Sequence, residues 1–289
     1  MTIPSSVSSI GDYSFRSCYS LTTVAIPTSV TYIGEGAFSF CDKLSYVSLP
    51  SSITEINPST FYSCESLGSV DIPASVTLID YSAFYGCTSL TSVIIPPSVT
   101  KIGKEAFQNC SNLTSVLIPP SVTKIGESAF KDCRNLSSVT ISPGVTEIMH
   151  SAFYGCSSLR EITIPESVLT IGEYAFMGTK LSTINFKCEI PPIFEYLAFS
   201  LSSARVYVPK GSLSAYEKAF EKIHSLHVEF REVEEWGSGI NDITADEQDT
   251  LLDVYTTQGI CVKRGATKAD IDALPKGLYI LGGKKLYVR

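Results

Sequence analysis

Residues 95–117 read IPPSVTKIGKEAFQNCSNLTSVL, and residues 118–140 repeat them with few changes as IPPSVTKIGESAFKDCRNLSSVT. Phenylalanine keeps this 23-residue spacing through most of the chain, at Phe15, Phe38, Phe61, Phe84, Phe107, Phe130, Phe153, Phe176 and Phe199. Cysteine keeps it at Cys18, Cys41, Cys64, Cys87, Cys110, Cys133 and Cys156. An apolar residue followed by proline also recurs, and only Ile141-Ser142 breaks that series. A fixed period of this length is the sequence signature of a solenoid, in which each unit stacks on its neighbours.

Each unit contains two short extended segments separated by a proline. Leu90, Val93 and Ile95 follow the alternation of a half-buried strand, which predicts that they point inward. The proline that follows ends this strand, because it cannot donate a hydrogen bond to a ladder. Val99 and Ile102 predict a second short extended segment on the opposite side of the coil.

The remainder of the unit predicts a compact turn. Gly103 allows the chain to reverse tightly. Residues 106–110 are expected to form a single helical or 3₁₀ turn, with Phe107 and Cys110 in the centre of the coil. A single unit cannot bury its own apolar face, so the units are expected to form one cooperative solenoid. At about 4.8 Å per rung, roughly nine rungs would span about 40 Å.

The unit resembles the BspA-like, or Treponema-type, leucine-rich repeat over about residues 1–228. The resemblance implies a leucine-rich-repeat solenoid of mainly β structure with short 3₁₀ or helical turns. It also implies a right-handed α/β-type superhelix with a parallel sheet on its concave face. Members of this family are bacterial surface proteins, and many are adhesins of host-associated species. One departure is the unit after Phe176, which is a residue short and has lost its cysteine.

The end of the repeats predicts a cap, which a solenoid needs because its last rung would otherwise expose the core. Residues 212–222 read as a helix in which Leu213, Tyr216 and Phe220 share one face. Ser214 and Glu217 have the spacing of a capping box. Residues 1–228 are therefore predicted to form the solenoid with its C-terminal cap.

Two further segments follow the cap. Residues 229–249 carry eight acidic side chains and one basic side chain around Trp236-Gly237-Ser238-Gly239, which predicts an acidic linker or the edge of the cap. Residues 250–289 predict a small β-module, with strands at 251–255 and 259–262, a helix at 267–274 and a hairpin at 277–289. Its ending resembles a C-terminal module on exported proteins of Bacteroidetes-type bacteria, where it serves sorting or attachment. The alternative is a packing module without that role.

Composition limits the function further. The 289 residues are 44% hydrophobic and 18% charged, so the chain can bury a large core. A net charge of -7 argues against nucleic acid as a partner, because phosphate binding needs a basic surface. No apolar run reaches the roughly eighteen residues of a transmembrane helix. The start shows no signal peptide, so an extracellular or cell-surface location, with a trimmed signal, rests on the resemblance.

The residues that usually carry chemistry predict no catalytic or metal site. Seven of the nine cysteines share one repeat phase, which predicts a ladder of buried thiols, although a disulfide between neighbouring rungs is not geometrically excluded. No C-x-x-C pair, G-x-S-x-G motif, phosphate-binding loop or dinucleotide fingerprint occurs. His150 is expected to be exposed, and His224 and His227 lack a carboxylate partner for a metal. Glu35, Glu127 and Glu173 recur as an exposed row. We therefore expect no cofactor and no enzymatic activity.

The outward positions of the first extended segment are the natural binding surface of a solenoid. Small serines and threonines occupy most of them, whereas Ile94 and Leu117 are adjacent apolar residues directed at solvent. An exposed apolar patch with a polar rim often marks a contact site. The candidate binding residues are Tyr46, Asp71, Ile94, Leu117, Thr140 and Glu161. Scattered surface apolar residues, or packing of the C-terminal module there, are the alternatives.

These features favour a non-catalytic, secreted or cell-surface protein that binds a macromolecule. The expected partner is a protein or glycan of the host or of the cell envelope. The alternative is a structural protein that self-associates through the solenoid ends or the C-terminal module. Light scattering distinguishes them, since self-association depends on concentration without any ligand.

Overall fold

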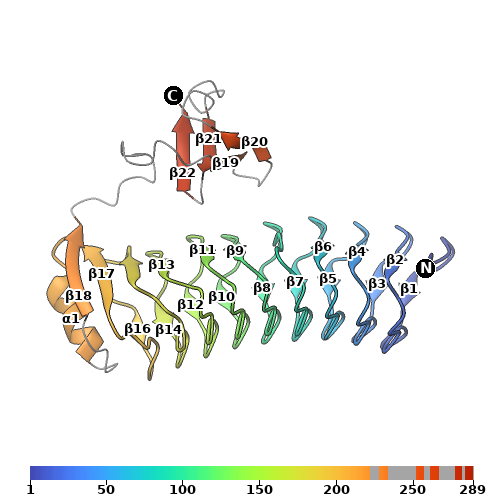
Figure 1. Ribbon diagram of the computed structural model, residues 1–289, viewed down its shortest axis with the longest axis horizontal. Helices are drawn as coiled ribbons and strands as arrows, with labels where there is room; N and C mark the ends of the chain where they lie inside the picture. Colours follow the sequence, from blue (N-terminus) through green and yellow to red (C-terminus); the bar gives the residue numbers. More distant parts are fainter. Residues whose placement is uncertain (222–227, 234–251, 257–260, 267–276, 282–283, 289) are drawn as a thin grey trace. The chain divides into compact units, whose positions relative to one another are not determined.

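The computed structural model describes residues 1–221, 228–233, 252–256, 261–266, 277–281 and 284–288 (Figure 1). The chain divides into two compact units, Met1–Val233 and Glu234–Arg289. Residues 1–221 and 228–233 form a parallel β-solenoid whose rungs stack side by side in one row (Figure 1).

One side of the solenoid, called the first sheet here, receives a strand from most rungs. Its strands are β2 (Thr23–Ala25), β4 (Tyr46–Ser48), β6 (Ser69–Asp71), β9 (Ser115–Ile118), β11 (Ser138–Ile141), β13 (Glu161–Ile164), β15 (Thr183–Phe186), β17 (Ala204–Pro209) and β18 (Val228–Val233). Paired neighbours up to β11 run parallel with a 23-residue register, as in Tyr46↔Ser69, whereas β13 and β15 pair with a 22-residue register. The middle residue of β4, Val47, is buried between two exposed residues, as the alternation predicts.

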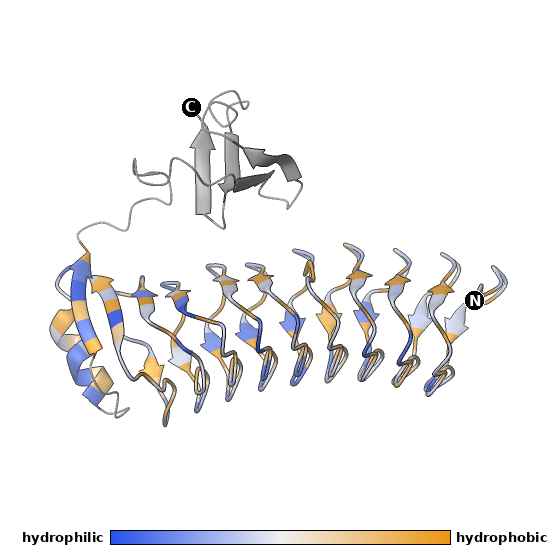
Figure 2. Ribbon diagram, viewed as in Figure 1, coloured by the Kyte–Doolittle hydropathy of each residue, from blue (hydrophilic) through white to orange (hydrophobic). Residues whose placement is uncertain are grey.

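The opposite side, the second sheet, consists of two-residue strands. They are β1 (Ser9–Ile10), β3 (Tyr32–Ile33), β5 (Glu55–Ile56), β7 (Leu78–Ile79), β8 (Lys101–Ile102), β10 (Lys124–Ile125), β12 (Glu147–Ile148), β14 (Thr170–Ile171) and β16 (Ile193–Phe194). In β8, β10 and β12 a polar residue faces out and a buried isoleucine faces in (Figure 2). The strands are short because the proline turn and the tight turn that follows leave room for one inward residue.

Both sheets contain interruptions. Among the described residues, the rung between β6 and β9 contributes only the bridge Ser92↔Ser115 to the first sheet, and β11 and β13 are not paired. The gap between β11 and β13 lies where Ile141-Ser142 departs from the repeat. Gly144 follows with a φ of 153°, and a Cβ there would lie 2.1 Å from the Pro120 carbonyl oxygen. In the second sheet, β3 pairs with β1 and β5 pairs with β7, but β3 and β5 are not paired with each other.

The core is a continuous stack of the repeat phenylalanines. Ring centroids of successive phenylalanines lie 5.0–5.7 Å apart, and their planes are within 11° of parallel. These separations lie within the range of favourable aromatic pairs. Phe38 to Phe199 are buried, whereas Phe15 in the first rung is only partly buried. The stack confirms that the 23-residue period places one phenylalanine in the centre of each rung.

The repeat cysteines form a ladder of hydrogen bonds beside this stack. From Cys41 to Cys156, each thiol donates to the backbone carbonyl of a phenylalanine in the preceding rung, with S···O distances of 3.1–3.2 Å. Burial raises the pKa of the Cys41 thiol to about 11 and that of Cys110 well above its usual value. The eight cysteines from Cys18 to Cys188 are free thiols. The expectation that all seven point into the core was wrong for Cys18, which is exposed because no described rung packs against that side.

The segment expected to form a helical or 3₁₀ turn forms successive reverse turns instead. Glu105 and Asn109 adopt left-handed φ values of 58° and 60°, which interrupt any helical repetition. The N–H groups of Glu105, Phe107 and Asn109 donate to the next rung, each at 2.8 Å. The intervening N–H groups of Gln108 and Cys110 close turns onto Glu105 and Phe107. The loops therefore hold neighbouring rungs together in place of a helix.

The C-terminal end is closed by helix α1 (Leu213–Glu221), which packs Tyr216 and Phe220 into the core as expected. The Tyr216 hydroxyl donates to the Cys188 carbonyl at 2.8 Å. Glu232 of β18 accepts hydrogen bonds from the backbone N–H groups of Gly211 at 2.8 Å and Leu213 at 3.4 Å. The predicted capping box was wrong, because Ser214 lies inside the helix and a carboxylate from β18 performs that role. The sheet continues to Val233, beyond the predicted boundary at residue 228.

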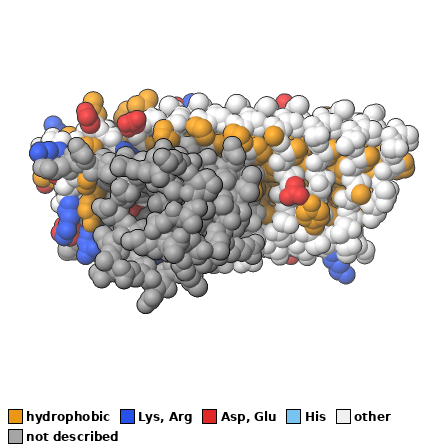
Figure 3. Space-filling model, turned by 90° about the horizontal axis from the view of Figure 1, so that it is seen from above, with side chains coloured by type: hydrophobic (Ala, Val, Ile, Leu, Met, Phe, Trp, Pro, Cys, Tyr) orange, Lys and Arg blue, Asp and Glu red, His pale blue; other side chains and the backbone are white. Residues whose placement is uncertain are grey.

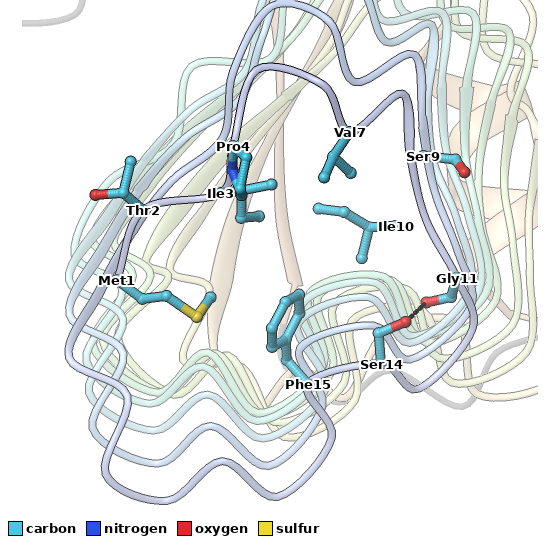
Figure 4. Close-up of a pocket in the computed structure, with 10 residues that line it drawn as sticks. All are labelled: Met1, Thr2, Ile3, Pro4, Val7, Ser9, Ile10, Gly11, Ser14 and Phe15. Atoms are coloured by element: carbon cyan, nitrogen blue, oxygen red, sulfur yellow. Dashed lines mark hydrogen bonds between the residues drawn. The ribbon is translucent and has the colours of Figure 1, made fainter.

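The first rung is open at the opposite end. A hollow of about 270 Å³ lies there, and Met1, Ile3, Val7, Ile10 and Phe15 line it (Figure 4). Ile3 and Ile10 belong to the same core that continues through the solenoid. Of the residues that line the hollow, Met1 is exposed and Phe15 is partly buried, whereas Ile3 and Ile10 are buried.

The second unit contains a small antiparallel sheet. Its described strands are β19 (Leu252–Thr256), β20 (Cys261–Ala266), β21 (Gly277–Leu281) and β22 (Lys284–Val288), in the order β20-β19-β21-β22. They overlap the segments for which the sequence predicts strands and a hairpin. The predicted helix at 267–274 and residues 234–249, with Trp236, lie outside the described residues, as do His224 and His227.

Candidate functional site

The six candidate residues all lie on the outer surface of the first sheet. Ile94 is 73% exposed, Leu117 43% and Tyr46 42%, and the other three are also exposed. Their backbone positions follow from the two-residue alternation, which buries the valine or isoleucine between each pair of outward residues. The structure nevertheless divides the six into three groups.

Tyr46 and Asp71 form the first group. The Tyr46 hydroxyl donates to Asp71 Oδ2 at 2.6 Å, across the paired strands β4 and β6. This hydrogen bond to a carboxylate raises the pKa of Tyr46. The contact fixes the tyrosine ring on the sheet surface, so it can serve as an ordered contact residue.

Ile94 and Leu117 form the second group, together with Thr140. The bridge Ser92↔Ser115 brings their rungs together, and each apolar residue lies two positions further along the chain. Leu117 is in register with Thr140 on β11. The serines at the parallel positions, Ser92 and Ser115, leave one flank of this apolar pair without bulky side chains. The result is a small apolar ridge bordered by Asp71 and Thr140.

Glu161 stands apart from the ridge. The first-sheet ladder is interrupted between β11 and β13, and the 23-residue period makes Glu161 equivalent to Ser138, two residues before Thr140. It accepts a hydrogen bond of 2.9 Å from Asn185 Nδ2, and Asn185 also lies 3.4 Å from Thr163 Oγ1. Glu161 therefore belongs to a polar C-terminal region of the first sheet.

This polar region includes a charged cluster that sequence reasoning missed. Arg231 donates to Glu229 Oε1 through Nη2 at 2.7 Å, and Arg205 Nε lies 3.7 Å from Glu229 Oε2. The hydrogen bond from Arg231 lowers the pKa of Glu229. Figure 3 shows charged side chains gathered at the β18 end and few on the visible N-terminal half. The alternation of buried and exposed residues in β17 would have placed Arg205 on the outer surface. Glu229 was missed because the sequence assigned it to the acidic segment at 229–249.

The residues considered for chemistry lie apart from one another. His150 Nδ1 contacts Glu173 Oε2 at 3.7 Å on the surface, and Glu127 pairs with Lys104 at 2.8 Å. Within the described residues, no group of three or more metal-binding side chains occurs. The described helix is also too short and polar to cross a membrane. The side chain of Cys261 lies outside the description.

Comparison with protein families provides the decisive match. The model of the BspA type leucine-rich repeat region matches in six copies, over residues 1–114 and 77–205. The chain belongs to the BspA-type leucine-rich-repeat family. Membership confirms the solenoid fold and makes the chain a repeat protein of a family of interaction scaffolds that are typically not enzymes.

Several solved structures are similar to this chain. A T. pallidum leucine-rich-repeat protein is 30% identical, with 55% of this BspA-type chain and 77% of that chain covered and a TM-score of 0.48. A Bacteroides ovatus leucine-rich-repeat protein is 24% identical, with 81% and 77% covered and a TM-score of 0.45. A leucine-rich cell surface protein of Faecalibacterium prausnitzii is 25% identical, with 81% and 79% covered and a TM-score of 0.36. Comparison with curated proteins gives no match.

Proposed function

We propose that this BspA-type protein is displayed at a cell surface or secreted, and that it binds another protein through the first sheet. The observation that carries the proposal is the exposed ridge of Ile94 and Leu117 between the polar residues Asp71 and Thr140. Aliphatic side chains gain free energy when a partner removes them from water, at roughly 25 cal/mol per Å². A partner protein offers complementary apolar side chains, whereas a neutral glycan offers mainly hydroxyl groups. Family membership and the F. prausnitzii cell surface protein support the location.

Tyr46 and Asp71 contribute the ordered polar part of this surface. Interfaces concentrate their binding energy in aromatic and well-packed apolar residues with a polar rim. The hydrogen bond between the two side chains holds Tyr46 in place before binding, which reduces the entropy lost on association. We therefore place the centre of the interface on Ile94 and Leu117, with Tyr46 at its edge.

The test is a binding screen of the whole chain against extracellular-matrix proteins, mucins and glycans. The variant Ile94→Asp/Leu117→Asp is expected to lose a protein hit by at least tenfold, since each charge must be desolvated at the interface. Leu169→Asp is the matched control, because Leu169 is an exposed apolar residue beside β14 of the second sheet. A protein hit that survives in the double variant, or hits among glycans alone, would contradict the proposal.

A further inference from the structure

A groove on the second sheet lies on the side opposite the proposed interface. It has a volume of about 430 Å³ and extends along the strands β8 and β10, between Tyr81 and Met149. This volume is within the range of small-molecule sites in proteins, about 300–1,000 Å³. The groove therefore has room for one small ligand unit.

A glycine at the same repeat position on each of two successive rungs creates the groove. The position after the inward isoleucine carries Asp80 and Met149 on the flanking rungs, but Gly103 and Gly126 on the two rungs between them. A Cβ on Gly103 would lie 2.7 Å from the Asp80 carbonyl carbon, and one on Gly126 would lie 2.5 Å from the Gly103 oxygen. Close backbone packing therefore excludes side chains there. The floor is bare backbone over two rungs, about 10 Å long.

The two ends of the groove are apolar. Tyr81 is 45% exposed and Met149 is 38% exposed. Most other rungs carry a charged residue at the repeat position of Tyr81 and a glycine at that of Met149. An aromatic ring and a thioether at the ends of a flat floor offer contacts to the C–H surface of a ring-shaped ligand. An inorganic anion would leave both ends unused.

The rims of the groove are polar and carry more positive than negative charge. Its lining includes Lys101, Lys104 and Lys124 but only the two carboxylates of Asp80 and Glu127. Lys104 pairs with Glu127 at 2.8 Å. Lys124 pairs with Glu147 at 2.9 Å. Within the described residues, Lys101 makes no ion pair, which leaves one ammonium group free to bind an anion.

Hydrogen-bonding groups complete the site. The Thr100 hydroxyl donates to the Thr77 carbonyl at 3.2 Å, so its lone pairs remain available as acceptors. The equivalent hydroxyl of Thr123, in contrast, makes no hydrogen bond that the described part of the chain shows. Together with the Glu127 carboxylate, these groups match the alternating donors and acceptors of sugar hydroxyls.

We propose that this groove binds a carboxylated sugar, with the carboxylate at Lys101, the hydroxyls at Thr100, Thr123 and Glu127, and the sugar rings along the floor between Tyr81 and Met149. The bare glycine floor admits a flat ring, and the free ammonium selects an acidic ring over a neutral one. An acidic peptide side chain would satisfy Lys101 but would not use the threonines. The ring can come from a uronic-acid polymer or from the acidic terminus of a branched glycan. This site is independent of the proposed protein interface.

The test titrates the whole chain with a glucuronic-acid trisaccharide, a galacturonic-acid trisaccharide and sialyllactose, and with maltotriose and lactose as neutral counterparts. Calorimetry and ligand-observed NMR measure the affinity. At least one acidic sugar is expected to bind at least tenfold more tightly than its neutral counterpart. The sugar that binds identifies the source of the ring. Failure of all the acidic sugars to bind would overturn the proposal.

Variants locate the site. Lys101→Gln is expected to weaken acidic-sugar binding about tenfold or more, the usual loss of a charge-assisted hydrogen bond. Tyr81→Ala should weaken it too. Lys43→Gln removes an exposed lysine elsewhere and is expected to change nothing. Unchanged binding by Lys101→Gln, or a short aspartate peptide that binds as tightly as the sugar, would overturn the assignment. The Ile94→Asp/Leu117→Asp variant should retain sugar binding, so the two proposals fail separately.

Discussion

The phenylalanine stack ends in two different ways. At the C-terminal end, Phe199 is buried beneath Phe220 of α1, and their ring centroids lie 6.1 Å apart. At the N-terminal end, Phe15 contacts Phe38 on one side and faces the hollow on the other (Figure 4). The residues occupy the same repeat position, so the difference comes from the neighbours. In a solenoid, the environment of a side chain depends on the rungs beside it as much as on its own sequence.

The largest expected effect compares the middle of the stack with its open end. Phe107→Ala removes a ring stacked on both faces and should cost about 3–5 kcal/mol of unfolding free energy. Phe15→Ala removes a ring with one stacked neighbour and should cost less than half as much. Urea unfolding followed by circular dichroism measures both. Equal losses would show that the first rung is as well packed as the interior.

The second comparison is between Cys18 and Cys41. Burial raises the Cys41 pKa from 9.0 to about 11, which reduces its thiolate about a hundredfold. Iodoacetamide is therefore expected to label Cys18 before Cys41 in the native protein. Peptide mapping by mass spectrometry identifies the modified residue, and labelling in urea is the control in which all thiols react. Native labelling of Cys41 at the rate of Cys18 would mean that the rungs open readily.

The smallest expected effect concerns the cap. Tyr216→Phe leaves the buried Cys188 carbonyl without its donor and should cost about 1–2 kcal/mol. Tyr196→Phe, at an exposed position, is the matched control and should leave the thermal midpoint unchanged. A loss equal to that of Phe107→Ala would mean that the cap detaches when this hydrogen bond is removed.

The 23-residue period predicted the core because each rung places the same repeat positions in its interior. It placed Phe107 in the stack and Cys110 beside it without any knowledge of the structure. The turns were less predictable, since the left-handed conformations of Glu105 and Asn109 satisfy hydrogen bonds to the next rung. Such bonds depend on neighbours that a local propensity does not include. The capping carboxylate of Glu232 was missed for the same reason, because it arrives from a later strand.

The candidate surface was predicted in part. Alternation along the strands correctly placed Ile94 and Leu117 outward, since one buried valine or isoleucine fixes the direction of its neighbours. It did not separate Glu161 from them, because the ladder is interrupted between β11 and β13 while the repeat pattern continues unchanged. The groove was also missed. Gly103 was interpreted as a turn residue, and the space above two consecutive glycines becomes apparent only when the rungs stack.

The gap between β11 and β13 has a mechanical consequence. On the other side of the same junction, Glu147↔Thr170 and Ile148↔Ile171 remain paired, and the loop bond from Phe153 to Ala175 is intact at 2.8 Å. The strands β11 and β13 remain packed side by side, but they lack the ladder hydrogen bonds that hold other neighbouring strands in register. Bending of the solenoid is therefore expected to concentrate at this junction, on the side that carries Thr140 and Glu161.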